Sequence, residues 1–195
     1  MINNAVILCG GKGERLVNPD RGEDYSCGVP KPLIEVGGQP FVRHLIDTLI
    51  HFGVSHVNLV VRKQDYQRYV SRIPEDSLSY IMAGDKADDA VCSITNLPSL
   101  FLLANGDCLP IMATSDWRAL LSRRDPCVTV KTTGGRDAGV ALVRKVDLEG
   151  KVSCDNIGGM RKVYKTFLVM GGLHIGTPQG LHRARQYMDI VVTGQ

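Results

Sequence analysis

Apolar positions along the chain fall into two patterns, short continuous runs and longer segments with helical spacing. Residues 5–9 (AVILC) form a continuous apolar run, which is typical of a strand covered on both faces of its sheet. From Pro40 onward, Phe41, Leu45 and Leu49 recur at helical spacing, and Gly53 supplies an end for the helix. Pro40 stands where the first helical residue is favoured. The chain therefore opens with a predicted strand and continues into a predicted helix.

The same two patterns continue to the end of the chain. They predict strands at residues 54–61, 100–104, 127–131, 139–143 and 166–170, and helices at residues 63–73, 117–121 and from Thr177-Pro178 to about residue 188. Such alternation argues for an α/β fold, a three-layer α/β/α sandwich with a Rossmann-like, mostly parallel sheet. No repeat, low-complexity tract or linker interrupts it, so we expect one domain over residues 1–195.

A glycine-rich loop, GGKGERL at residues 10–16, follows the first predicted strand and carries Lys12 and Arg15. Glycines allow backbone N–H groups to approach phosphate oxygens closely, and the two cations, with Lys31 further along, offset phosphate charge. A Walker A loop is excluded because no Ser or Thr follows Lys12. A dinucleotide fingerprint is excluded because Leu16 stands in place of its third glycine. The loop fits a nucleoside triphosphate, with a plain strand-to-helix turn as the alternative.

Three motifs occur in a fixed order: GGKGERL at residues 10–16, KPLIEVGGQP at 31–40 and LLANGDCL at 102–109. Together they resemble the sugar-1-phosphate nucleotidyltransferase family. The resemblance implies a nucleotide-diphospho-sugar transferase-like fold of the GT-A type. It also implies attack by a sugar 1-phosphate on the α-phosphorus of an NTP, which yields a nucleotide-sugar and pyrophosphate. Residues 31–40 look most like hexose cytidylyltransferases and heptose or mannose guanylyltransferases.

The resemblance implies roles for individual residues. Those of the nucleotide site would be Leu8, Gly10, Gly11, Lys12, Gly13 and Gly84. Arg15 would stabilise the leaving pyrophosphate, Lys31 would contact the reacting phosphates, and Asp107 would hold Mg²⁺. Because the attacking phosphate is largely ionised at neutral pH, alignment and charge neutralisation would supply the rate, without a strong general base. Asp107 could instead be a turn residue after Asn-Gly, and Lys12 could be a solvated loop residue.

The chain departs from the family pattern between its first motifs and in its second half. The segment from Arg15 to Lys31 is longer than usual. The Glu-Lys-Pro motif, whose lysine contacts the sugar phosphate, is absent. Lys151, Arg161 and Lys162 are its possible substitutes, and the sequence does not choose among them.

The C-terminal part admits two alignments with the family. In the first, which spacing from Gly139 favours, residues 167–175 match the family's central segment and the chain stops before the second metal-binding Asp. In the second, HIGTPQG at residues 174–180 matches the family's last motif, and His174 stands at the place of that Asp. The second carboxylate is absent from its expected place in both. The usual C-terminal part of the domain is then expected to be missing or altered.

Composition limits the classes of partner and the location that we expect for this protein. The net charge of +3 is too small to argue for nucleic acid, and no apolar run reaches membrane-spanning length. The chain enters a strand within a few residues, so we expect no signal peptide. The six cysteines are dispersed without a Cys-x-x-Cys pair, which favours a reduced, cytoplasmic protein. The family often forms homo-oligomers, but no apolar helix face identifies an interface here.

Three functions fit these observations. The favoured one is a cytidylyl- or guanylyl-type sugar-1-phosphate nucleotidyltransferase that uses NTP, sugar 1-phosphate and Mg²⁺. The second is a nucleotide-binding or regulatory homologue with impaired catalysis, which the missing carboxylate and the absent Glu-Lys-Pro motif suggest. The third is a nucleotidyltransferase with a non-sugar phosphate acceptor.

Overall fold

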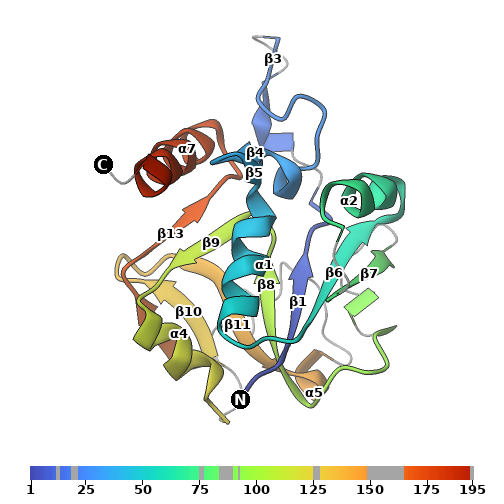
Figure 1. Ribbon diagram of the computed structural model, residues 1–195, viewed down its shortest axis with the longest axis vertical. Helices are drawn as coiled ribbons and strands as arrows, with labels where there is room; N and C mark the ends of the chain where they lie inside the picture. Colours follow the sequence, from blue (N-terminus) through green and yellow to red (C-terminus); the bar gives the residue numbers. More distant parts are fainter. Residues whose placement is uncertain are drawn as a thin grey trace.

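The computed structural model describes residues 1–11, 14–18, 22–74, 77–83, 90–91, 93–124, 128–148 and 165–193. A seven-stranded sheet runs through its centre in the order β12-β10-β11-β8-β1-β6-β7 (Figure 1). Its strands are β1 (Asn4–Leu8), β6 (His56–Arg62), β7 (Leu78–Ala83), β8 (Leu100–Asn105), β10 (Val128–Thr132), β11 (Asp137–Arg144) and β12 (Lys165–Val169). Neighbouring strands run parallel throughout this sheet except where β11 pairs with β8 and β10. The predicted α/β fold with a mostly parallel sheet is confirmed.

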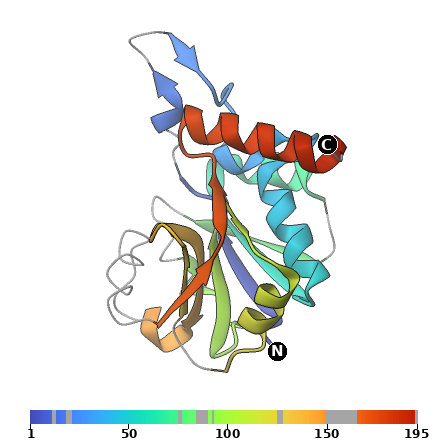
Figure 2. The same ribbon diagram turned by 90° about the vertical axis from the view of Figure 1, so that its left-hand side faces the viewer.

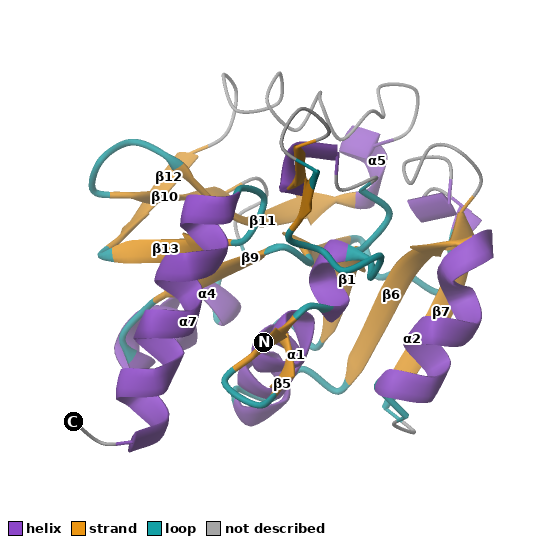
Figure 3. Ribbon diagram, turned by 90° about the horizontal axis from the view of Figure 1, so that it is seen from above, coloured by secondary structure: helices purple, strands orange, loops and turns teal. Residues whose placement is uncertain are grey.

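Helices cover both faces of the sheet, which gives the predicted three layers. On one face lie α1 (Phe41–His51), α2 (Tyr66–Arg72) and α4 (Thr114–Leu121), and on the other lies α5 (Lys145–Leu148) (Figures 2 and 3). The long helix α7 (Pro178–Thr193) lies near the end of the sheet toward which β1 points (Figure 1). Side chains of β1 alternate between the two faces. Ala5 and Ile7 join the α1 side of the core, whereas Val6 and Leu8 pack with Val91 on the opposite side.

Helix α1 follows its predicted pattern with one shift at its start. It begins at Phe41, and Phe41, Leu45 and Leu49 are buried. Pro40 is the N-cap residue with extended backbone, one position before the helix, so its prediction as the first helical residue is one residue early. Gly53 has φ +91°, a conformation that glycine adopts without steric cost, and it follows the helix as predicted.

The other predicted strands occur with bounds that differ by one or two residues. The helix predicted at residues 63–73 divides into a 3-10 turn, Lys63–Asp65, and α2. Helix α4 begins earlier than predicted, at Thr114, and α7 continues beyond residue 188 to Thr193. Among the described residues no helix has both the length and the apolar character needed to cross a membrane.

Several strands were not predicted, and the most important pair is β9 (Cys108–Ile111) with β13 (Gly171–His174). They form an antiparallel two-stranded sheet in which His174 stands opposite Cys108. Pro110 and the two glycines of β13 are residues that strands usually avoid, which explains why the pattern failed here. The edge strand β7 was also missed, as were the hairpins β2 (Val17–Asn18) with β3 (Glu23–Asp24) and β4 (Glu35–Val36) with β5 (Gln39–Pro40).

Candidate functional site

The glycine loop and the Asn-Gly-Asp turn lie at the same end of the sheet. Strands β1 and β8 are parallel neighbours, and Leu8 at the end of β1 pairs with Asn105 at the end of β8. The Gly106 N–H donates a hydrogen bond to the Leu8 carbonyl oxygen at 2.9 Å. A Cβ on Gly106 would stand 2.8 Å from the Cys9 sulfur, so a larger residue cannot fit this contact without movement. Asp107 is thereby fixed beside the start of the glycine loop, at the edge where α/β sheets bind ligands.

Lys31 reaches the same place from a different segment. It opens the short 3-10 helix Lys31–Leu33, and its side chain is only 8% exposed. Its Nζ donates a hydrogen bond to Asp107 Oδ2 at 3.2 Å. Gly11 lies beside it, since a Cβ at Gly11 would be 3.8 Å from the Lys31 Nζ. The structure therefore brings loop, lysine and carboxylate together.

A second partner of Asp107 comes from the C-terminal part of the chain. The Nε2 of His174 lies 3.3 Å from the same Oδ2. The next residue supports this placement, because the Ile175 N–H donates to the Asp107 carbonyl oxygen at 3.0 Å. The Cys108 thiol donates to Asp107 Oδ1 at 3.5 Å. His174 thus occupies the position beside Asp107 that the HIGTPQG alignment gives it, and the alignment that spacing favours is not the one that this geometry supports.

The environment of Asp107 keeps its carboxylate ionised. Burial by itself raises the pKa of Asp107. The hydrogen bond from His174 and the charge of Lys31 act in the opposite direction, and together they hold the pKa of Asp107 well below its usual range. Asp107 is therefore a permanent anion at neutral pH, as a cation ligand needs to be.

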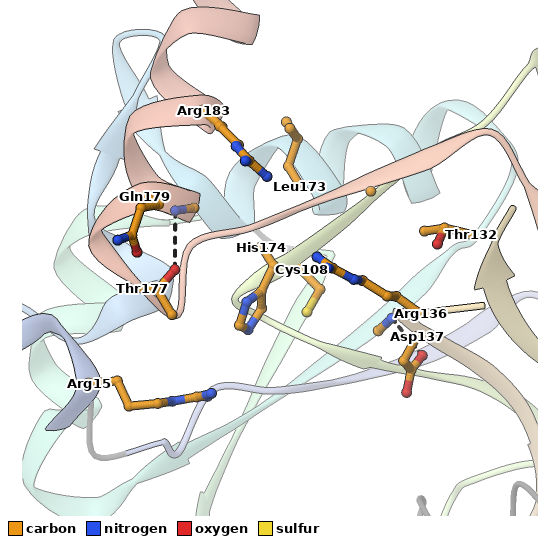
Figure 4. Close-up of a pocket in the computed structure, with 13 residues that line it drawn as sticks. Arg15, Cys108, Thr132, Arg136, Asp137, Leu173, His174, Thr177, Gln179 and Arg183 are labelled. Carbon is orange, nitrogen blue, oxygen red and sulfur yellow. Dashed lines mark hydrogen bonds between the residues drawn. The ribbon is translucent and has the colours of Figure 1, made fainter. Parts of the chain in front are cut away.

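A pocket of about 560 Å³ opens beside this cluster (Figure 4). Its lining residues are Arg15, Cys108, Thr132, Arg136, Asp137, Gly139, Gly172, Leu173, His174, Thr177, Gln179, Gly180 and Arg183. The arginines come from three elements: Arg15 from the 3-10 helix Glu14–Leu16, Arg136 from the turn between β10 and β11, and Arg183 from α7. In Figure 4 their side chains extend into the pocket. Guanidinium groups suit phosphate and carboxylate groups, so the pocket fits an anionic ligand.

The first turn of α7 packs against the backbone of His174. The Gly180 N–H donates to Thr177 Oγ1 at 3.2 Å, which confirms Thr177 as the predicted N-cap of this helix. A Cβ on Gly180 would lie 2.0 Å from the His174 carbonyl oxygen. Only glycine allows this approach, and it places Arg183, almost one turn further along α7, over the pocket.

The structure describes some of the predicted site residues and not others. Arg15 lines the pocket and Asp107 lies next to it. Lys31 is hydrogen-bonded to Asp107, Gly11 lies beside Lys31, and Leu8 and Gly10 lead from β1 into the loop. Lys12, Gly13 and Gly84 lie outside the described residues, as do Lys151, Arg161 and Lys162.

Arg136 and Arg183 were missed because neither belongs to a recognisable motif. The available signal for Arg183 was its position in the helix that follows HIGTP.

The described ligand atoms allow a test of the metal expectation. One oxygen of Asp107, the Cys108 sulfur and a His174 nitrogen lie within 4.8 Å of one another. Mg²⁺ takes oxygen ligands in a strict octahedral arrangement. Asp107 fits that requirement, whereas the Cys108 sulfur and the His174 imidazole do not. The three donors therefore fit a divalent cation, but only one of them suits Mg²⁺.

Several solved structures share the fold over nearly the whole chain. HddC from Yersinia pseudotuberculosis superposes with a TM-score of 0.73 at 19% identity, covering 95% of this chain and 99% of that one. A UTP-bound UGPase from Acinetobacter baumannii gives 0.73 at 13% identity, with coverage of 98% and 94%. The inositol-1-phosphate CTP transferase from T. maritima gives 0.71 at 16% identity, with coverage of 99% and 97%. At these identities the likeness establishes the fold.

Curated relatives match parts of the chain. A probable glucose-1-phosphate cytidylyltransferase of Bacillus subtilis is 37% identical over 57 residues, 29% of this chain and 20% of the relative. The bifunctional protein GlmU of Methanocaldococcus jannaschii is 30% identical over 109 residues, 53% of this chain and 24% of the relative. The matched segments thus span about a fifth to a quarter of these relatives' length.

The family model of the MobA-like NTP transferase domain matches residues 5–169, which include the glycine loop, Lys31, Asp107 and most of the central sheet. The chain therefore belongs to the MobA-like NTP transferase domain family.

Proposed function

We propose that this protein condenses an NTP with a sugar 1-phosphate to give an NDP-sugar and pyrophosphate. The observation that carries the proposal is the Lys31–Asp107 pair. A buried cation and a partly buried anion lie 3.2 Å apart beside the glycine loop and next to a pocket with three arginines. A transfer between two highly charged phosphates needs this arrangement of fixed charges more than it needs a general base.

The proposed reaction follows from the placement of these groups. A phosphate oxygen of the acceptor forms a bond to the α-phosphorus, the bond from the α-phosphorus to the bridging oxygen breaks, and pyrophosphate leaves. Arg15 neutralises the departing pyrophosphate. Lys31 moves its hydrogen bond from Asp107 to the reacting phosphate and stabilises the charge that accumulates there. Gly10 and Gly11 leave room for the triphosphate at the end of β1.

The acceptor phosphate needs a cation in place of the missing lysine of Glu-Lys-Pro. Arg136 and Arg183 both line the pocket, and they come from the turn between β10 and β11 and from α7. A forked guanidinium binds a phosphate through paired hydrogen bonds, so these residues can hold the acceptor in line with the α-phosphorus. We assign the sugar 1-phosphate to this half of the pocket.

Proteins of this family generally use divalent metal ions. When bound, such an ion neutralises the charge between the two substrates. Asp107 would hold it together with phosphate oxygens and water, and Asp107 taken by itself is a ligand that suits Mg²⁺. The base is proposed as cytosine or guanine from residues 31–40, and a cytidylyltransferase and mannose-1-phosphate guanylyltransferases are among the relatives. The free thiols of Cys9, Cys27 and Cys108 support a cytoplasmic location.

The test is thermal stability with ATP, CTP, GTP, UTP and dTTP, each with and without a divalent ion. A nucleotide at 100 times its Kd adds about 2.7 kcal/mol to the free energy of unfolding. The nucleotide that stabilises most is then assayed for pyrophosphate release with a panel of sugar 1-phosphates and with inositol 1-phosphate. Release with a sugar phosphate supports the proposal. Release only with inositol phosphate favours a non-sugar acceptor, and binding without any release favours the impaired homologue.

A further inference from the structure

We propose that Asp107 and His174 form a mixed carboxylate–imidazole site that binds a first-row transition-metal dication, such as Mn²⁺ or Co²⁺, in preference to Mg²⁺. For the role of the ion in turnover this inference rests on the proposed function. Binding of the ion by the protein alone does not depend on it.

The distance between the two ligand atoms suits one bound ion. His174 Nε2 and Asp107 Oδ2 are 3.3 Å apart. Ligands at about 2.1 Å from an ion lie roughly 3 Å from each other when they occupy adjacent positions. An ion between them would take the place of the proton that Nε2 donates to Oδ2, with the remaining ring proton on Nδ1, and the two atoms need only a small adjustment. The side chains are 19% and 43% exposed for Asp107 and His174, so an ion from solvent can reach both.

The imidazole is held in place by the backbone around it. Antiparallel pairing of β13 with β9 sets His174 opposite Cys108, and the Ile175 N–H bonds to the Asp107 carbonyl oxygen. A Cβ on Gly176 would be 2.3 Å from His174 Cε1, so the turn that follows the strand packs directly on the ring. The Cys108 thiol bonds to the other carboxylate oxygen, Oδ1, at 3.5 Å and orients the carboxylate. A ligand pair fixed in this way is preorganised for binding.

Ligand chemistry decides which ion the pair prefers. Mg²⁺ is a hard ion that takes oxygen ligands and loses water reluctantly. Imidazole is a good ligand for the first-row transition ions, whose affinity rises along the series from Mn²⁺ to Cu²⁺. The imidazole nitrogen therefore adds to the affinity of the site for a transition-metal ion and adds little to its affinity for Mg²⁺.

Lys31 makes ion binding depend on the nucleotide. Its Nζ is bonded to the same Oδ2 that the ion needs, so it competes with the ion in the free protein. A triphosphate that draws Lys31 toward its own oxygens frees Oδ2 and adds phosphate ligands. Ion and nucleotide therefore increase each other's affinity by the same factor, as linkage requires.

The test measures Mn²⁺ binding by electron paramagnetic resonance and its displacement by Mg²⁺. The variants are His174→Ala, His174→Asp and the control His182→Ala, whose histidine is exposed on α7 and does not line the pocket. We expect His174→Ala to lose about ten-fold or more in Mn²⁺ affinity. His174→Asp should still bind an ion, with the ratio of Mn²⁺ to Mg²⁺ affinity reduced about ten-fold. The control should match the wild type.

Two outcomes would overturn the inference: a Mn²⁺ affinity that His174→Ala leaves unchanged, or a Mn²⁺/Mg²⁺ ratio that His174→Asp leaves unchanged. Thermal unfolding of each variant shows that it is folded. If no NTP binds but Mn²⁺ binding depends on His174, the inference stands and the proposed function fails. If nucleotide transfer is found and ion preference is indifferent to residue 174, the function stands and the inference fails.

Discussion

Lys31 and Asp107 are 76 positions apart in the sequence, yet the Lys31 Nζ and the Asp107 Oδ2 meet at 3.2 Å with little exposure of either side chain. A charged pair that is largely removed from water contributes modestly while intact, because desolvation offsets much of the attraction between the charges. Loss of one partner is more costly, since the other charge stays buried. This asymmetry determines what substitution at either position does.

Replacement of Lys31 by Met should lower both the stability of the fold and the affinity for triphosphate, and the two effects can be measured separately. The free energy of unfolding should fall by about 1–3 kcal/mol, because the Asp107 carboxylate loses a charged hydrogen-bond donor. Triphosphate affinity should fall about ten- to a hundred-fold, which corresponds to one hydrogen bond between charged groups. Urea unfolding and calorimetric titration with the stabilising nucleotide measure the two effects. Met at Lys63, in the 3-10 turn before α2, is the control. Undiminished triphosphate affinity in Lys31→Met would remove Lys31 from the phosphate site.

Acid should weaken the fold through Asp107. Its folded-state pKa lies below the unfolded value, so its contribution to stability is complete above about pH 3.9 and is lost as the pH falls toward the folded pKa. Asp107→Asn lacks a group that titrates there. We therefore expect the wild type to lose more free energy of unfolding between pH 7 and pH 3 than the variant does. Urea titrations at several pH values measure this, and parallel pH profiles would contradict the environment assigned to Asp107.

Arg183→Gln should weaken binding of the acceptor and leave binding of the nucleotide unchanged. We expect about a ten-fold increase in KM for the sugar phosphate, the size of one charged hydrogen bond, with nucleotide affinity unchanged. Arg185, exposed on the same helix and not in the pocket, supplies the matched control Arg185→Gln. Pyrophosphate release at varied acceptor concentration provides the measurement. Equal KM values in the two variants would place the acceptor elsewhere.

Two glycines with similar backbones allow steric crowding to be separated from backbone strain. Gly135 and Gly139 have φ of +76° and +77°. A Cβ at Gly135 meets nothing within 4 Å, whereas one at Gly139 would stand 2.3 Å from the Cys108 Cβ. Gly135→Ala should cost about 1–2 kcal/mol from the backbone alone. Gly139→Ala should lower the free energy of unfolding by more than this. It should also weaken ion binding, because the displaced Cys108 thiol donates a hydrogen bond to the Asp107 carboxylate. Urea unfolding and Mn²⁺ titration compare the two, and equal losses would argue against crowding at Cys108.

Local patterns in the sequence predicted the sheet and the first half of the site. The apolar run of β1, the helical spacing of α1 and the motif at Asp107 are each encoded within a few residues, and α/β topology then places Asp107 beside the glycine loop. Arg15 and Lys31 stand out as cations near the glycine loop, and the family resemblance added their individual roles and that of Asp107 as a metal ligand. Nothing within a few residues of Lys31 indicated that Asp107 would be its partner.

The C-terminal half of the site depends on contacts that no local pattern contains. His174 reaches Asp107 only because β13 pairs with β9, and both strands carry residues unfavourable to strands. Spacing along the chain therefore favoured the other alignment. Arg136 and Arg183 enter the pocket from a turn and from a helix whose relative positions are set by the whole sheet.

The partners of Asp107 also have a consequence for the order of folding. Apart from its neighbour Cys108, one partner, Lys31, comes from the first third of the chain, and two, His174 and Ile175, come from the last. Contacts across such sequence separations carry the entropy cost of closing long loops. We expect Asp107 to have all of its partners only when the pairing of β1 with β8 and that of β13 with β9 are both in place. The competent site is then a marker of completed folding.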